Sequence, residues 1–175
     1  MKYLLLSISL LLASCTGTPE NIKPVEPFEL QRYLGTWYEI ARLDHSFERG
    51  LNQVTANYTL RDDGGVKVIN RGYSQEEKEW KEAEGKAYFV DGTNTAYLKV
   101  SFFGPFYGSY IVFELDKKDY NYALISGPDK SYFWILARQP QLEPELLQRL
   151  IAKAKSLGFA TENLIMVDHS PIPQQ

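Results

Sequence analysis

The sequence predicts an all-β fold, an eight-stranded antiparallel up-and-down barrel with one C-terminal α-helix packed outside it and a short final strand. Three observations favour this class. Turn residues recur about every 8–14 positions between Gly35 and Arg138, several of the intervening segments alternate apolar and polar residues, and the apolar period becomes helical after Arg138. Many short strands of even spacing favour a closed barrel, and a β-sandwich is the structural alternative.

The strand boundaries follow from the turn signals. The tetrapeptides at 62–65 (DDGG) and 91–94 (DGTN) are hairpin signals, and Gly104-Pro105 breaks the chain between two phenylalanines. Segments such as 54–60 (VTANYTL) alternate between an apolar and a polar face, which is typical of an antiparallel sheet with one buried side. The expected strands are 36–43, 52–61, 66–74, 80–90, 95–103, 108–115, 120–126 and 131–138.

A helix is expected after the last strand. Pro144 suits a first helical turn, and Glu143 and Glu145 are favourable at that end of the helix dipole. Leucine, isoleucine and alanine then recur at helical spacing until Gly158, which is well placed as the stop. The apolar run 164–167 predicts a short ninth strand at an edge.

The N-terminus indicates export. Lys2 precedes an apolar run that is shorter than the about 20 residues of a membrane-spanning helix, which is the layout of a secretory signal. Cys15, the one cysteine of the chain, follows Leu12-Ala13-Ser14 and resembles the lipobox of bacterial lipoproteins. The resemblance implies acylation of Cys15. Because Thr16 follows it instead of aspartate, the family rule implies the outer membrane of a bacterium with two membranes. A free thiol beside an ordinary cleavage site is the alternative.

The chain is predicted to contain one domain. We assign a lipoprotein signal peptide to 1–14, a lipidated, proline-rich tether to 15–30 and the barrel domain to 31–175. A domain of about 150 residues can bury one substantial core. The net charge is about −4 without Lys2 and no basic block occurs, which argues against a nucleic acid partner. A single cysteine excludes an internal disulfide.

Three segments, in the expected order, resemble the signature regions of the lipocalins. They are Gly35-x-Trp37-Tyr38, the segment 119–122 (DYNY) and Arg138. The stretches 35–50 and 101–108 are similar to the bacterial lipocalins that are outer-membrane lipoproteins. The resemblance implies the barrel fold and binding of fatty acids or lysophospholipids. No cofactor and no metal is expected.

The barrel topology predicts a closed floor. Trp37 begins the first strand and Arg138 ends the eighth, so the two meet where the barrel closes, with the guanidinium over the indole. Glu39 shares the parity of Trp37 and, as a buried carboxyl group, needs a partner. We expect a tyrosine hydroxyl or Arg138 to be the hydrogen-bond partner of Glu39. The predicted structural floor consists of Gly35, Trp37, Glu39 and Arg138.

The longer loops at 44–51, 74–79, 103–108 and 127–130 are expected together at the opposite end, as a mouth. Its predicted residues are Phe47, Arg49, Phe103, Phe106 and Tyr107; the alternative is that these aromatics fold back over the barrel. Small inward residues predict a cavity; they are Ala56, Ala83, Gly85 and Ala87. The predicted ligand-binding residues are Tyr58, Val68, Ala87, Phe89, Leu98, Val100, Tyr122, Leu124, Tyr132 and Trp134. For the strand 108–115, either parity could face inward.

These expectations lead to a functional hypothesis: storage or transport of fatty acids or lysophospholipids during envelope maintenance or stress. Arg49 or Lys130 would meet a phosphate or carboxylate of the ligand. The competing hypothesis is an envelope interaction module with a filled barrel and no lipid; a homodimer is also left open. An enzyme is not predicted, because no nucleophile–base pair is visible and His45 and His169 lack metal-ligand spacing.

Overall fold

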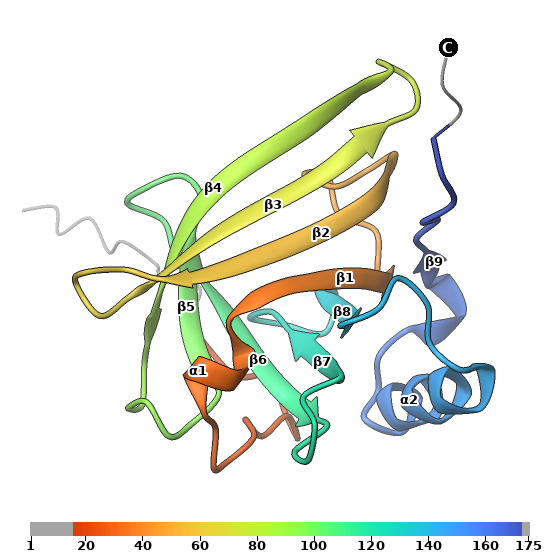
Figure 1. The fold of residues 1–175 in the computed structure, drawn as a ribbon. Coiled ribbons are helices and arrows are strands. Elements are labelled where there is room, and N and C mark those ends of the chain that lie inside the picture. Colours follow the sequence, from red (N-terminus) through yellow and green to blue (C-terminus); the bar gives the residue numbers. More distant parts are fainter. Residues whose placement is uncertain (1–15, 173–175) are drawn as a thin grey trace, which may run out of the picture.

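The computed structural model describes residues 16–172, so the predicted signal peptide and Cys15 lie outside the described residues. Antiparallel strands follow one another around a barrel in the order β2-β3-β4-β5-β6-β7-β8-β1, and pairing of β1 with β2 closes it (Figure 1). The predicted eight-stranded barrel is therefore confirmed. Its strands are β1 (Gly35–Arg42), β2 (Leu51–Leu60), β3 (Val66–Ser74), β4 (Glu79–Phe89), β5 (Tyr97–Ser101), β6 (Gly108–Leu115), β7 (Tyr122–Ser126) and β8 (Phe133–Ala137).

Three further elements lie outside the barrel wall at the C-terminal end of the chain. The predicted helix is α2 (Pro144–Ser156), and it buries Leu150 and Ala154 against the barrel. A 3-10 turn, η1 (Thr161–Asn163), leads to the short β9 (Ile165–Met166). β9 pairs with Ala41 and Arg42 of β1, which confirms the predicted edge strand. Figure 1 shows α2 beside the barrel, away from β3 and β4.

The barrel wall separates two apolar cores. One lies inside the barrel, and the other lies between the barrel and α2. In β6, Tyr110 and Val112 face the inner core while Ile111 and Phe113 face the outer core, which settles the parity of that strand.

The segment before the barrel runs from the outer wall, where Ile22 joins the outer core, to the closed end of the barrel, where Val25 and Phe28 join the inner core. Ile22, Val25 and Phe28 are buried, although the sequence analysis assigned them to a tether. The amide of Val25 donates to the Val112 carbonyl (2.8 Å), and the amide of Ala96 donates to the Val25 carbonyl (2.9 Å). A short helix that was not predicted, α1 (Leu30–Tyr33), then leads into β1. No helix within residues 16–172 has the length and apolar character needed to cross a membrane.

Candidate functional site

The barrel encloses a cavity of about 890 Å³ that opens at one end. Its lining extends from Phe28 and Tyr33 near the floor to residues of the four longer loops at the mouth. The four longer loops therefore surround the mouth as predicted. Because the barrel is hollow, the filled barrel of the competing hypothesis is wrong. Small side chains leave the space open: Ala56, Ala83 and Ala87 line it, while Gly85 allows the Phe102 ring to lie against its strand.

The floor is built around Trp37, which is fully buried. Its indole Nε1 donates to the Tyr33 carbonyl (2.8 Å), and Cζ of Arg138 lies 4.0 Å from its ring centre. The Arg138 guanidinium also donates to the carbonyls of Arg32 (2.7 Å) and Leu34 (3.0 Å). One cation thus covers the indole and ties the chain that enters β1 to the end of β8.

Seven of the ten predicted ligand-binding residues line the cavity, and three do not. Phe89 packs against the inner core beside Phe28. Tyr122 and Leu124 face the outer core under α2, contrary to the prediction. β7 is apolar on both faces, because one faces the cavity and the other faces α2, so its parity could not be read from the pattern. The predicted residues that line the cavity are Tyr58, Val68, Ala87, Leu98, Val100, Tyr132 and Trp134.

At the mouth, Phe47, Arg49, Phe103 and Phe106 lie where the sequence analysis placed them. Two other assignments are wrong. Tyr107 lies on the outer wall, 6.5 Å from the Tyr88 ring and under Nζ of Lys99. Lys130 lies beside Gly158 at the end of α2, away from the cavity. Arg49 is already paired with Asp44, at 2.7 Å.

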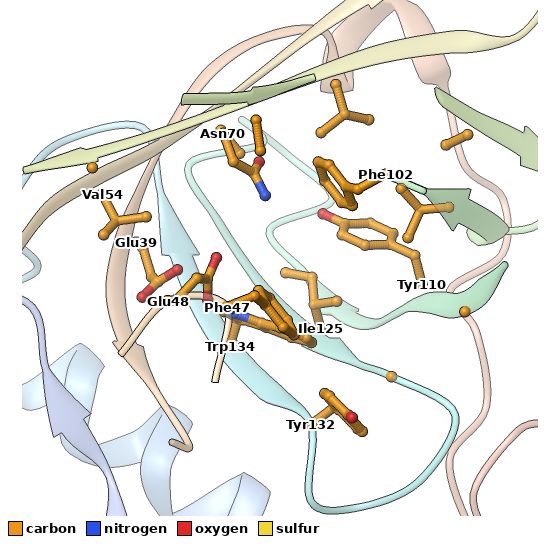
Figure 2. A pocket seen from close by; sticks show the side chains of 18 of the residues that line it. Glu39, Phe47, Glu48, Val54, Asn70, Phe102, Tyr110, Ile125, Tyr132 and Trp134 are labelled. Atoms are coloured by element: carbon orange, nitrogen blue, oxygen red, sulfur yellow. Dashed lines mark hydrogen bonds between the residues drawn. The ribbon is translucent and has the colours of Figure 1, made fainter. Parts of the chain in front are cut away.

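A buried polar cluster lies on the mouth side of the cavity and includes Glu39, which was wrongly predicted to lie in the floor; its other members were not predicted. Glu39 is bonded to Nη1 of Arg42 (2.7 Å), so neither a tyrosine nor Arg138 is its partner. The other terminal nitrogen of Arg42 donates to the carbonyls of Glu48 (2.9 Å) and Leu51 (3.1 Å). Oε2 of Glu48 accepts from the indole of Trp134 (3.0 Å). Figure 2 shows the carboxyl groups of Glu39 and Glu48 side by side.

The cluster exists because β1 is irregular. Residues 39 and 42 would lie on opposite faces of a regular strand. The register of β1 against β8 shifts between Glu39 and Ala41, and this bulge brings both charges to one side. The signal in the sequence was the pair of opposite charges three residues apart in an otherwise apolar strand.

Burial shifts the ionisation of the cluster. It raises the pKa of Glu39 to about 8, with the nearby Glu48 carboxylate acting in the same direction and Arg42 opposing it. Burial likewise raises the pKa of Glu48. For His45, which is stacked on Phe47, burial and then Arg42 lower the pKa to about 4. One guanidinium thus faces two carboxyl groups, and near neutral pH the pair holds a proton more readily than free carboxyl groups do.

These shifts predict a pH dependence of stability. The pKa of Glu39 is raised in the folded state. The stability that Glu39 contributes is therefore complete below about pH 4.5 and is lost as the pH rises through about 8. The pKa of His45 is lowered, so the stability that His45 contributes is lost as the pH falls, but only below about pH 6.5. Between pH 6.5 and 8, the free energy of unfolding should therefore decrease with pH, and Glu39→Gln should reduce that slope. Urea unfolding at four pH values measures it; an unchanged slope would contradict the assignment.

Deeper in the cavity, three tyrosine hydroxyls form a chain. The Tyr110 hydroxyl lies 2.7 Å from that of Tyr33 and 2.8 Å from that of Tyr58. Oδ1 of Asn70, which also lines the cavity, is buried without a hydrogen-bond partner within residues 16–172. The described residues include no group of three or more His, Cys, Asp or Glu that could hold a metal ion. The site is therefore an apolar cavity with a few fixed polar groups, which suits one amphiphilic ligand.

Comparison with known proteins agrees with this geometry. The family description of a lipocalin-like domain matches residues 28–169. The chain belongs to the lipocalin family. Members of this family are binding and transport proteins.

Bacterial relatives of this lipocalin match almost its whole length. It is 61% identical to outer membrane lipoprotein Blc of Vibrio cholerae, over 93% of this chain and 95% of that protein. It is 51% identical to outer membrane lipoprotein Blc of Escherichia coli K12, over 90% of this chain and 89% of that protein. Insecticyanin of the tobacco hornworm shares the fold, with a TM-score of 0.69 at 24% identity over 88% of this chain and 87% of insecticyanin.

Proposed function

We propose that this lipocalin binds single-chain lipids, fatty acids and above all lysophospholipids, and stores or carries them at the outer membrane. The observation that carries the proposal is the cavity of about 890 Å³, closed at the Trp37 floor and open at an aromatic rim. Its volume lies within the range of about 300–1,000 Å³ that is usual for small-molecule sites. Burying a 16-carbon chain would contribute on the order of 12 kcal/mol before the costs of association.

The polar groups of the cavity favour lysophospholipids over fatty acids. Glu39, Glu48 and Oδ1 of Asn70 are hydrogen-bond acceptors or acids. A glycerol hydroxyl or an ammonium group donates to such acceptors, whereas a fatty-acid carboxylate would be repelled by them when they are ionised. Arg49 could contact a lipid phosphate at the rim only by sharing its guanidinium with Asp44.

The location and the absence of catalysis are also proposed. The relatives named outer membrane lipoprotein support an acyl anchor on Cys15 at the outer membrane, with a role in envelope maintenance or stress. Binding without catalysis fits the positions of the histidines. His45 is stacked between Phe47 and Tyr132, and His169 contacts the backbone carbonyl of Glu39.

Tryptophan fluorescence tests the proposal. Trp134 lines the cavity, Trp37 is buried under Arg138, and Trp80 lies on the outer wall. Titrating residues 16–175 with a 16-carbon lysophospholipid should shift the emission to saturation at micromolar or lower concentration, because the alkyl chain replaces water beside the Trp134 indole.

Matched tryptophan variants identify the reporter. Trp80→Phe should keep the response, and Trp134→Phe should abolish it, while lipid still raises the melting temperature of both proteins. An absent response in the unmodified chain, together with no thermal stabilisation by any single-chain lipid, would refute lipid binding in this cavity.

A further inference from the structure

We propose that the barrel stands mouth-down on the membrane, with Phe47, Phe103 and Phe106 in contact with a zwitterionic phospholipid surface. The inference rests on the acyl anchor of the proposed function and adds an orientation to it. Two independent features support this orientation: the place where the described chain begins, and the aromatic rim of the mouth.

The described chain begins near the mouth and runs toward the floor. The Gly17 carbonyl accepts from the Ser109 hydroxyl (2.7 Å), and Ser109 is the second residue of β6, directly after the mouth loop. The Thr16 carbonyl accepts from the hydroxyl of Tyr97 (3.0 Å), the first residue of β5, whose partner Ile111 lies two positions farther from the mouth than Ser109. From there the chain reaches Val112 through Val25 and then the floor turn, where the amide of Phe28 donates to the Asn94 carbonyl (2.8 Å).

The acyl anchor would therefore enter the membrane at the mouth end. Cys15 is the next residue before Thr16, and consecutive Cα atoms lie about 3.8 Å apart. Residues 16 and 17 are held against the barrel wall by their carbonyl groups, so little chain remains between the wall and the anchor. An orientation with the floor on the membrane would require the anchor to extend along β6 from Ser109 to Leu115.

The rim provides the second contact. Phe103 and Phe106 are 79% and 68% exposed, and Phe47, stacked on His45, is 56% exposed. These are the three most exposed large apolar side chains within residues 16–172. A single weak membrane signal gives reversible binding, whereas an added apolar contact fixes the position of an anchored protein. The floor turns at 62–65, 91–94 and 116–119 expose mainly Asp, Gly, Thr, Asn and Lys, and the apolar side chains beside them, Leu60 (52%) and Val90 (39%), are smaller and less exposed.

The charge of the rim indicates which lipid surface it fits. Lys81 is paired with Glu77 and Glu79, and Arg49 is paired with Asp44. Glu76 and Asp129, which also line the mouth, have no ion-pair partner within the described residues. The four mouth loops hold six acidic and three basic residues, and a rim with this net negative charge is unsuited to a strongly anionic surface. With the mouth against a zwitterionic leaflet, a lysolipid would pass between the bilayer and the cavity without crossing water.

A fluorescent probe at each end of the barrel tests the orientation. In the acylated full chain the sulfur of Cys15 is blocked, so a cysteine introduced elsewhere is the one reactive thiol. Phe106→Cys marks the rim, and Thr93→Cys marks the exposed turn at the floor as the matched control. Both are labelled with the same nitrobenzoxadiazole probe and placed in phosphatidylcholine–phosphatidylethanolamine vesicles, with or without a nitroxide-labelled lipid.

The rim probe should be quenched by the nitroxide lipid at least threefold more strongly than the floor probe, and its emission should shift to the blue. Equal quenching of the two probes, stronger quenching at the floor, or no quenching at either position would overturn the orientation. Lipid binding measured through Trp134 is independent of these outcomes, so failure of the orientation is distinguishable from failure of the proposed function.

Discussion

Trp37→Ala should lower the free energy of unfolding by about 3–5 kcal/mol, the range for removing a large aromatic side chain from a core. Trp37 is fully buried, donates to the Tyr33 carbonyl, and is covered by Arg138. The substitution opens a hole at the point where β1 meets β2 and β8, and leaves the Tyr33 carbonyl without its donor. Urea unfolding followed by circular dichroism measures the loss.

Trp80→Ala is the matched control for this prediction. Trp80 also carries an arginine over its ring, with Cζ of Arg71 4.1 Å from the ring centre, but it is 42% exposed on the outer wall. Its replacement should cost no more than about 1 kcal/mol, the value of an exposed cation–π contact. If the two substitutions cost the same, Trp37 does not hold the floor together.

Arg42→Met should also destabilise the protein by about 3–5 kcal/mol at pH 9, above the Glu39 pKa of about 8, which is typical of removing one partner of a buried ion pair. The change keeps an apolar stem of similar length but leaves Glu39 and Glu48 without a cation. It also removes the donor to the carbonyls of Glu48 and Leu51, which fix the first mouth loop. The loss should shrink at pH 4, because the protonated carboxyl groups need no cation.

A double-mutant cycle isolates the ion pair. At pH 9, Glu39→Gln in the Arg42→Met background should recover at least 1 kcal/mol, because the buried charge is removed with its partner. If Glu39→Gln gives no recovery, or if the loss caused by Arg42→Met is the same at pH 4 and pH 9, Arg42 acts only through packing.

The barrel and its floor could be predicted because they depend on pattern and topology. Alternation in β2 and β5 shows which faces are buried, and closure of an up-and-down barrel requires the first and last strands to meet, so Trp37 and Arg138 lie together. The predicted strand 95–103 is shorter, Tyr97–Ser101, because Ala96 bonds to Val25 of the N-terminal segment. That contact joins residues far apart in the sequence, and no local pattern indicates it.

The interior polar groups could not be predicted, for two physical reasons. A bulge reverses the parity of β1 after Glu39, so Arg42 turns inward where regular alternation would turn it outward. β7 is covered on both faces, so Tyr122 and Leu124 look the same in the sequence as Ala123 and Ile125, although only the latter pair faces inward. The alternation of residues along a strand predicted which side chains point inward only where one face of the strand meets water.

Native mass spectrometry of residues 16–175 with a 16-carbon lysophospholipid tests most directly whether the hollow of the barrel is the lipid site. The unmodified protein should bind one lipid per chain. Ala56→Phe with Val68→Phe, which fills the cavity, should weaken binding at least tenfold, and Thr59→Phe with Lys67→Phe, a cross-strand pair on the outer face, should not. Equal binding by both double variants, or no bound lipid in the unmodified chain, would contradict the account.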